Sequence, residues 1–336
     1  SSVDATLAVK RQPGRAWAVL QLPPTRIVIA IVALALAIGV LQTAARTAGV
    51  APHSVPGLFG ALLIIIGTLA TYAAFVRVVE RRRVAELGSA GAAREYGAGF
   101  ALGFVLFSLT MLVLWLFGAV DVVAAGGWTA FGYPLLDAVI AAVTEEVLMR
   151  GIVFRIVEES LGSWIALAFS AALFGAMHAF NRGATVTSSI AIALEAGVLL
   201  AAVFMLTRRL WMVIGVHTAW NFAEGGIFGA SVSGGEAHGI LASHFHGPDV
   251  LTGGAFGPEA SIVAVLICFG TGAAFLWLAS KRGHFVRPFW ARKVVTEGAT
   301  GGWLKRYLHH EVSGAVLPAR DRPARHFEQN CPRTAN

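Results

Sequence analysis

The heptapeptide TEEVLMR, residues 144–150, lies inside an apolar run, residues 134–157, that is long enough to cross a membrane. Charged side chains are costly there, because inserting each one into hydrocarbon costs about 2.5–3.5 kcal/mol. A chain that keeps three of them within six residues keeps them for function. On a helix, Glu146 and Arg150 stand one turn apart with the acid first, which predicts an ion pair on one face.

Glu145 has no such partner within its own helix. Neighbouring helical residues point about 100° apart, so Glu145 and Glu146 are expected to face different surroundings. A carboxylate in a water-poor place must find other polar groups or take up a proton, and either outcome makes Glu145 a candidate general base.

Two later apolar segments, residues 163–180 and 211–230, offer polar groups at one-turn spacing. The first carries His178 four residues after Phe174, and the second carries His217 four residues before Asn221. Hydrolysis of a peptide bond needs an activated water and donors for the oxyanion, and side chains on facing helices can supply both.

The patterns Glu-Glu-x-x-x-Arg, Phe-x-x-x-His and His-x-x-x-Asn, in this order on three apolar segments, resemble the motifs of the CPBP family of intramembrane proteases. This family includes the CAAX prenyl endopeptidases and bacterial proteins linked to bacteriocin processing and immunity. The resemblance covers residues 134–230. It implies that Glu145 activates water, that His178 holds this water or the carboxylate, and that His217 and Asn221 donate to the oxyanion. It gives Phe174 a packing role.

The composition predicts an all-α, polytopic transmembrane bundle. Hydrophobic residues make up 56% of the chain, charged residues make up 13%, and the mean hydropathy is +0.69. Spanning a bilayer takes about 20 apolar residues. Eight segments qualify: residues 27–45, 58–78, 99–120, 134–157, 163–180, 186–206, 211–230 and 260–280. We expect an N-terminal arm (1–26), a bundle (27–280) with its CPBP-like core at 134–230, and a basic, partly disordered tail (281–336).

The positive charge of the chain is distributed as expected for a membrane protein rather than for a nucleic-acid-binding protein. The formal net charge is +7, and Lys and Arg gather before the first segment, between the second and third, after the sixth and after the last. Short cytoplasmic loops are enriched in these residues, which predicts that both termini are cytoplasmic. A multi-pass protein of the bacterial cytoplasmic membrane is the expected setting. Cys268 and Cys331 form no disulfide framework and no metal spacing.

The expected partners are a peptide or protein substrate at the membrane and anionic lipid at the basic tail. After residue 280, Lys and Arg alternate with Phe and Trp, which is typical of an interfacial anchor. We expect no nucleic-acid partner, and the sequence leaves the oligomeric state open.

Two alternatives use the same residues. Glu145, His178 and His217 form the donor set of a catalytic zinc, but the chain lacks His-Glu-x-x-His, so metal-free water activation with no required cofactor is favoured. The other alternative is a non-catalytic membrane protein of the same fold, acting in immunity or in transport through a polar cavity.

Further polar residues are secondary candidates. Glu195 lies in the middle of the sixth segment, Glu224 could orient His217, and Asp137 could complement the start of the fourth helix. The Gly-rich and Ser-rich loop 231–259 is a candidate lid, and it carries three histidines that could bind a metal: His238, His244 and His246. At about 1.5 Å per residue, the heights of the three main catalytic candidates disagree, so a segment boundary is misplaced or a helix is broken.

Overall fold

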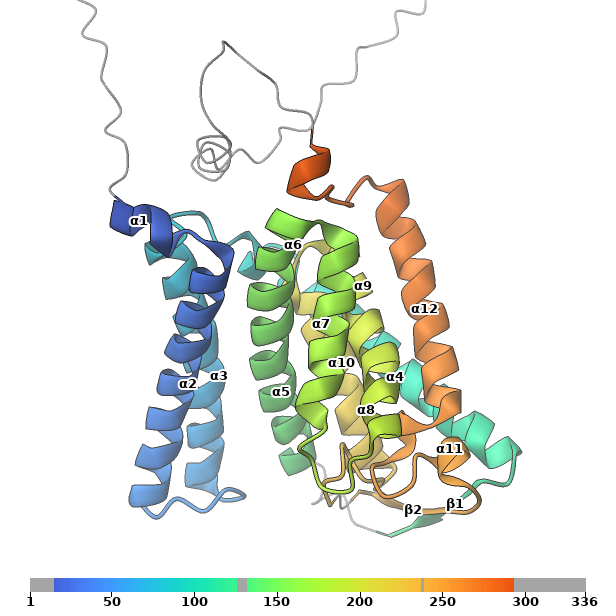
Figure 1. Ribbon diagram of the computed structural model, residues 1–336. Helices are drawn as coiled ribbons and strands as arrows, with labels where there is room; N and C mark the ends of the chain where they lie inside the picture. Colours follow the sequence, from blue (N-terminus) through green and yellow to red (C-terminus); the bar gives the residue numbers. More distant parts are fainter. Residues whose placement is uncertain (1–14, 126–131, 237–238, 293–336) are drawn as a thin grey trace, which may run out of the picture. The chain divides into compact units, whose positions relative to one another are not determined.

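The computed structural model describes residues 15–125, 132–236 and 239–292, and these are mostly helical, as the composition predicts (Figure 1). The α-helices are α1 (Arg15–Leu20), α2 (Pro23–Thr47), α3 (Val55–Val78), α4 (Ala92–Leu116), α5 (Gly132–Glu146), α6 (Arg155–Leu161), α7 (Ser163–His178), α8 (Val186–Ile192), α9 (Val198–Thr207), α10 (Leu210–Asn221), α11 (Asp249–Thr252) and α12 (Ile262–Lys281).

Three π-helical segments continue α-helices without a break. They are η3 (Val147–Phe154) between α5 and α6, η4 (Ala193–Gly197) between α8 and α9, and η5 (Phe222–Ile227) after α10. Short 3₁₀ turns occupy Ala85–Leu87, Pro258–Ala260 and Phe289–Ala291. Each of the eight predicted segments is therefore largely one helical stretch.

Within the described residues, five helical stretches are long and apolar enough to cross a membrane: Pro23–Thr47, Val55–Val78, Ala92–Leu116, Val186–Thr207 and Ile262–Lys281. The apolar helix Ser163–His178 is shorter. The chain is thus an integral membrane protein by its apolar helices, while the count of eight spans and the orientation of the termini stay predictions. The expected N-terminal arm lies mostly, and the tail beyond residue 292 entirely, outside the described residues.

Local sequence signals begin several of these helices. Pro23 and Pro24 occupy the first turn of α2, where a missing N–H costs nothing. The hydroxyls of Ser54 and Ser261 accept from Gly57 N and Ala264 N at the starts of α3 and α12. Such caps satisfy backbone donors that the first turn leaves free.

Helix α10 lies between α4 and α5, and glycines set its distance from α4. A Cβ on Gly103 of α4 would come within 2.2 Å of Val216 O, and a Cβ on Gly215 of α10 would come within 2.3 Å of Tyr96 O. No side chain fits at those distances, so the two backbones approach closely, as small residues allow in membrane bundles. This contact places His217, the residue after Val216, against α5.

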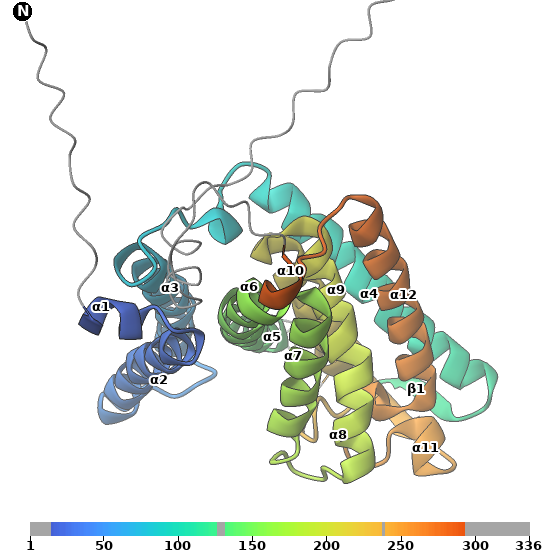
Figure 2. The same cartoon turned by 45° about the horizontal axis from the view of Figure 1, so that its top comes forward.

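Helices α2 and α3 pack side by side, and α3 also contacts α5, while α12 packs along α9 (Figures 1 and 2). At the end of the bundle where α2 begins and α3 ends, six charged side chains form what we call the end cluster: Arg26, Glu80, Arg82, Glu86, Arg155 and Glu159. The end cluster joins α2 and the residues after α3 to α6.

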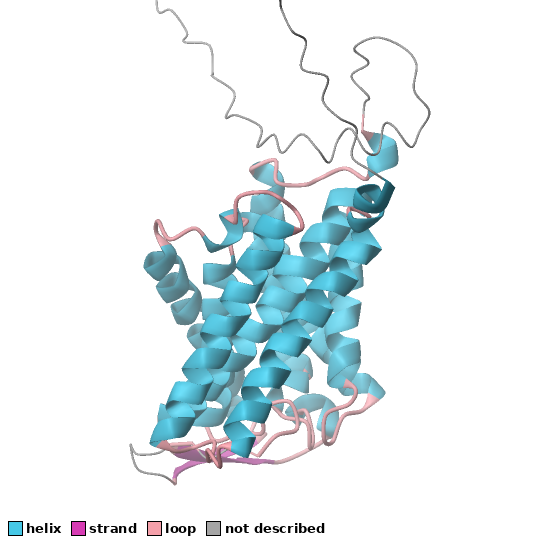
Figure 3. Cartoon of the chain, turned by 90° about the vertical axis from the view of Figure 1, so that its left-hand side faces the viewer, coloured by secondary structure: helices cyan, strands magenta, loops and turns pink. Residues whose placement is uncertain are grey.

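A two-stranded antiparallel ribbon is the feature that the sequence analysis did not predict. Strand β1 (Val120–Ala124) pairs with β2 (Leu241–Phe245), and Val122 faces Ser243 in the register. The ribbon and the loops near it lie at one end of the helices (Figure 3). The segment VDVVA, residues 120–124, has the β-branched composition of a strand. Its partner strand lies about 120 positions further along the chain, so no local sequence pattern predicts that the two pair.

Candidate active site

The heptapeptide 144–150 covers the change from α5 to the π-helical η3. The hydroxyl of Thr144 bonds back to Ile140 O at 2.7 Å and Ala141 O at 3.1 Å, a contact that often bends helices. The wider turn begins at Val147. π-helical turns are rare overall, and those that occur are often found at functional sites. The π-helical turn η3 carries Arg150.

Glu146, Arg150 and His217 form a buried group that we call the inner cluster. Nη1 of Arg150 donates to Oε1 of Glu146 at 2.9 Å, and Nδ1 of His217 lies 2.8 Å from the same oxygen. The side chains of Glu146 and Arg150 are 0% exposed. The predicted ion pair is therefore present, and one carboxylate oxygen serves both partners. The residue that orients His217 is Glu146 rather than Glu224, the candidate that the sequence analysis considered.

Arg150 also ties its helix to η4 and α7. Its second terminal nitrogen donates to Ala196 O and Gly197 O, each at 3.2 Å. These carbonyls belong to or adjoin a π-helical turn, which departs from the regular α-helical hydrogen-bond register. The guanidinium carbon lies 4.8 Å from the centre of the Phe174 ring. Phe174 therefore packs between Arg150 and the two site histidines, with ring centres 4.7 Å from His178 and 6.2 Å from His217.

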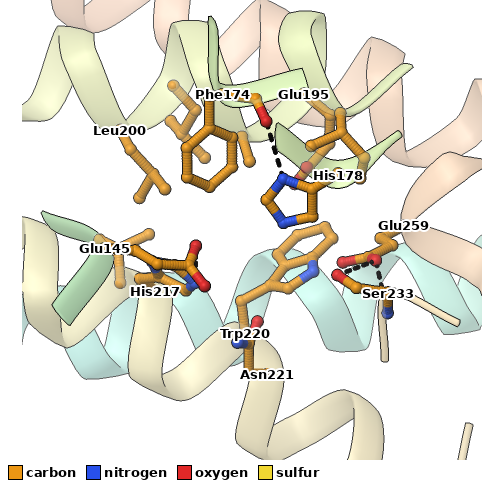
Figure 4. Close-up of a pocket in the computed structure, with 14 residues that line it drawn as sticks. Glu145, Phe174, His178, Glu195, Leu200, His217, Trp220, Asn221, Ser233 and Glu259 are labelled. Atoms are coloured by element: carbon orange, nitrogen blue, oxygen red, sulfur yellow. Dashed lines mark hydrogen bonds and ion pairs between the residues drawn. The ribbon is translucent and has the colours of Figure 1, made fainter. Parts of the chain in front are cut away.

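Glu145 lines a pocket (Figure 4), and Glu146 is not among the residues that line it, as expected for neighbours that diverge on a helix. Its side chain is 29% exposed, and its Oε2 lies 4.0 Å from Nε2 of His217. That oxygen is buried and accepts no hydrogen bond within the described part of the chain. Glu145 thus presents a free carboxylate oxygen near an imidazole nitrogen.

His178 is the last residue of α7, and its Nδ1 lies 2.8 Å from Phe174 O. If Nδ1 carries the proton for that carbonyl, Nε2 is the acceptor of a neutral ring. Helix α7 has 16 residues, which corresponds to about 24 Å of length, less than the roughly 30 Å of a hydrocarbon core. The end of such a short helix can lie below the membrane surface, so His178 need not stand at the outer edge that the eight-segment prediction gave it.

The pocket brings together Glu145, His178, His217 and Asn221, which come from α5, α7 and α10. It offers about 40 Å³ to the centres of water molecules, and one water needs roughly 10–15 Å³ on this measure. Figure 4 shows Glu145 and Glu259 on opposite sides of the pocket, with His178 between them. The site has room for a water beside the candidate base.

Sequence reasoning did not assign three of the polar pocket residues to the site: Trp220, Ser233 and Glu259. Ser233 N and Oγ both donate to Glu259 Oε1 at 2.7 Å, so the loop after α10 closes one side of the pocket. This supports the expectation that the loop covers the cavity. The spacing of Trp220 three residues after His217 could have placed it on the same helical face.

The remaining secondary candidates lie apart from the pocket or have other partners. Asp137 pairs with His53 at 3.1 Å, and both side chains are exposed. His246 pairs with Asp121 at 2.9 Å between the strands' ends. His238 lies outside the described residues.

The three candidate zinc ligands Glu145, His178 and His217 are not arranged as a metal site. Among residues 15–125, 132–236 and 239–292, no group of three or more His, Cys, Asp or Glu is arranged to hold a metal ion. The two site histidines each use Nδ1 for a protein acceptor, and only Glu145 and His217 approach within 4.0 Å. The three residues do not fit a zinc ion in this arrangement.

Comparison with known proteins supports the family resemblance over the segment that carries the site. The model of the family described as type II CAAX prenyl endopeptidase Rce1-like matches residues 126–223, which is less than a third of the 336 residues. This match spans all seven motif residues and is consistent with the CPBP family. No curated protein and no solved structure matches the chain significantly.

Proposed function

We propose that this chain is an intramembrane endopeptidase that hydrolyses a peptide bond in a membrane-associated or lipidated substrate. The observation that carries the proposal is the pocket in which a free Glu145 oxygen lies 4.0 Å from Nε2 of His217. The match of residues 126–223 to a prenyl endopeptidase family supports the same class of reaction.

In the proposed mechanism, Glu145 takes a proton from a water in the pocket as the water attacks the scissile carbonyl. Nε2 of His178, left as an acceptor by the contact of Nδ1 with Phe174 O, helps to hold that water. The proton on Glu145 then goes to the leaving amine, and the carboxylate is regenerated.

The oxyanion is assigned to His217 and Asn221. His217 donates from Nε2 when both ring nitrogens carry protons, and its contact with the Glu146 carboxylate stabilises that form. Asn221 lies one turn further along the same helical stretch and also lines the pocket. Buried donors of this kind contribute several kcal/mol to acyl transfer, about 2.7–4 kcal/mol for one donor. No metal ion takes part in this mechanism, and no cofactor is required.

The proposed function also has a proposed membrane topology. Eight spans with both termini on the cytoplasmic face of a bacterial membrane fit the distribution of Lys and Arg. A tag placed within residues 231–259 should then face outward. Anionic lipid is the proposed partner of the basic residues from the end of α12 onwards, of which Lys281, Arg282, Arg287 and Arg292 are described.

The experiment is a comparison of membrane proteomes from cells that carry the wild type or Glu145→Ala at equal abundance. The proposal expects at least one peptide whose cleavage depends on Glu145. A phenotype that survives Glu145→Ala, with no cleavage product lost, would instead support the non-catalytic reading in immunity or transport.

A further inference from the structure

Buried carboxyl groups in the described residues fall into two sets. In the first set each carboxylate has an arginine: Glu80, Glu86, Glu146 and Glu158 pair with Arg155, Arg82, Arg150 and Arg208. In the second set, Glu195, Glu224 and Glu259 are 2%, 0% and 4% exposed, and no lysine or arginine of residues 15–125, 132–236 and 239–292 forms an ion pair with them.

The second set gathers on one side of the pocket. Glu195 and Glu259 line it, and Glu224 lies against Glu259. Burying a carboxyl group without a countercharge is costly, and three of them together are costlier still. Burial raises the pKa of Glu259, which is expected for a buried acid without a cationic partner.

Two polar atoms in the same place also lack a partner. Oε2 of Glu195 is buried and accepts no hydrogen bond among the described residues, and Nε1 of the 5%-exposed Trp220 donates none. In Figure 4 the indole nitrogen of Trp220 is on the side of the ring towards Ser233 and Glu259. The unsatisfied carboxylate oxygen of Glu195 calls for a ligand that donates to it, whereas the N–H of Trp220 is a donor that only an acceptor, such as a backbone carbonyl of the substrate, can satisfy.

We propose that Glu195 and Glu259 form a subsite for a cationic group of the substrate, either the ammonium of a lysine or the guanidinium of an arginine. This inference rests on the proposed function, because the substrate it describes is the one that Glu145 cleaves. Glu259 is held for this role, since Ser233 fixes Oε1 with two donors.

Geometry gives the subsite a fixed relation to the cleaved bond. Glu145 and Glu259 lie on opposite sides of one pocket (Figure 4). A cation bound by Glu195 and Glu259 therefore sits at a constant number of residues from the scissile carbonyl. The enzyme should prefer Lys or Arg at one position near the cut and should discriminate against a neutral side chain of the same length there.

The first experiment maps cleavage sites. Purified wild type in proteoliposomes is incubated with a library of membrane peptides, with Glu145→Gln as the blank, and the cut sites are read by mass spectrometry. Enrichment of Lys and Arg at one position is expected. Cleavage that depends on Glu145 but shows no such enrichment overturns the subsite alone. The absence of any cleavage dependent on Glu145 overturns the proposed function, and the subsite with it.

The second experiment measures the preference with one cleaved peptide and its copy, in which norleucine replaces the enriched Lys or Arg. The ratio of kcat/KM for the two peptides should be at least about tenfold in wild type, as expected for a charge-assisted contact. It should fall towards one in Glu195→Gln and Glu259→Gln. Glu236→Gln is the matched control, because Glu236 is 78% exposed and pairs with Arg182. An unchanged ratio in both pocket variants overturns the proposal.

A third measurement needs no variant that might fail to fold. Butylammonium and butylguanidinium should each inhibit the wild type more strongly than the neutral 1-pentanol. Stronger inhibition by butylammonium would indicate a preference for Lys, and stronger inhibition by butylguanidinium a preference for Arg. Equal inhibition by the neutral compound would contradict the cationic subsite.

Discussion

The inner cluster and the end cluster each take residues from one continuous helical stretch, α5–η3–α6, and both join buried arginine to glutamate, yet they are built differently. In the end cluster, Glu80 accepts from Arg26 at 2.8 Å, from Arg82 at 2.9 Å and from Arg155 at 2.8 Å. In the inner cluster, the single oxygen Glu146 Oε1 serves both partners, and Glu146 Oε2 has none among the described residues.

This difference separates a redundant structural network from a site held by single contacts. Losing one member of the end cluster leaves every carboxylate with another arginine. Losing Glu146 leaves Arg150 and His217 without their shared acceptor. We therefore expect the two clusters to respond differently to the same kind of substitution.

The largest effect on stability is expected from Glu146→Gln. Breaking a fully buried pair costs about 3–5 kcal/mol, because the remaining charge is left uncompensated. The free energy of unfolding in detergent should fall by that amount, and Arg150→Met in the same chain should restore part of it. Turnover should also fall, because His217 loses its orienting acceptor. A fully stable Glu146→Gln protein would show that the inner cluster does not hold the helices.

A smaller loss is expected from Arg155→Met in the end cluster. Glu80 keeps Arg26 and Arg82, so the loss should be limited to hydrogen bonds to charged groups, about 1.5–3 kcal/mol. Turnover per folded molecule should stay close to wild type. A loss as large as that of Glu146→Gln would remove the contrast between the two clusters.

Acid should weaken the end cluster. Burial raises the pKa of Glu80, but Arg155, Arg26 and Arg82 outweigh that effect and hold the pKa below its ordinary value. A lowered folded-state pKa contributes stability above the unfolded value, about 4.3, and this stability is lost as the pH falls through the folded value. Melting curves between pH 7 and 3.5 should show that wild type is more stable than Glu80→Gln at neutral pH. This difference in melting temperature should shrink as the pH falls below the unfolded-state pKa of about 4.3. A difference in melting temperature between wild type and Glu80→Gln that grows as the pH falls would contradict this prediction.

The smallest effect is expected from metal removal. If Glu145 acts without zinc, protein stripped by a strong chelator should keep its full rate, and metal analysis should find no stoichiometric zinc. Loss of activity that is recovered on adding zinc back would favour the alternative in which Glu145, His178 and His217 are ligands.

The sequence predicted those parts of the site that are encoded by spacing along one helix. Glu146 and Arg150 pair as their four-residue separation implies, and Glu145 faces another way because neighbouring residues diverge. Composition likewise predicted the helical membrane fold. The contact of His217 with Glu146 was not predicted, because it depends on how two helices face each other.

Other features lack a local signal for a different reason. Ser233 and Glu259 reach the pocket from a loop without periodicity, and the register of Val120 with Phe245 depends on a distant partner. The π-helical turns change hydrogen-bond register within apolar sequence, which hydropathy does not detect. Long-range contacts and backbone register were thus the parts that only the structure revealed.

The most direct test of Glu145 as the general base is a turnover rate per folded molecule. It is measured for Glu145→Gln, Glu146→Gln and wild type on the same peptide, one that the wild type cleaves. The amide keeps the shape of the carboxylate but accepts no proton, and general base catalysis contributes about 10²–10⁴-fold. The account predicts a rate lower by that factor with an unchanged melting temperature. A Glu145→Gln protein that cleaves at the wild-type rate would contradict it.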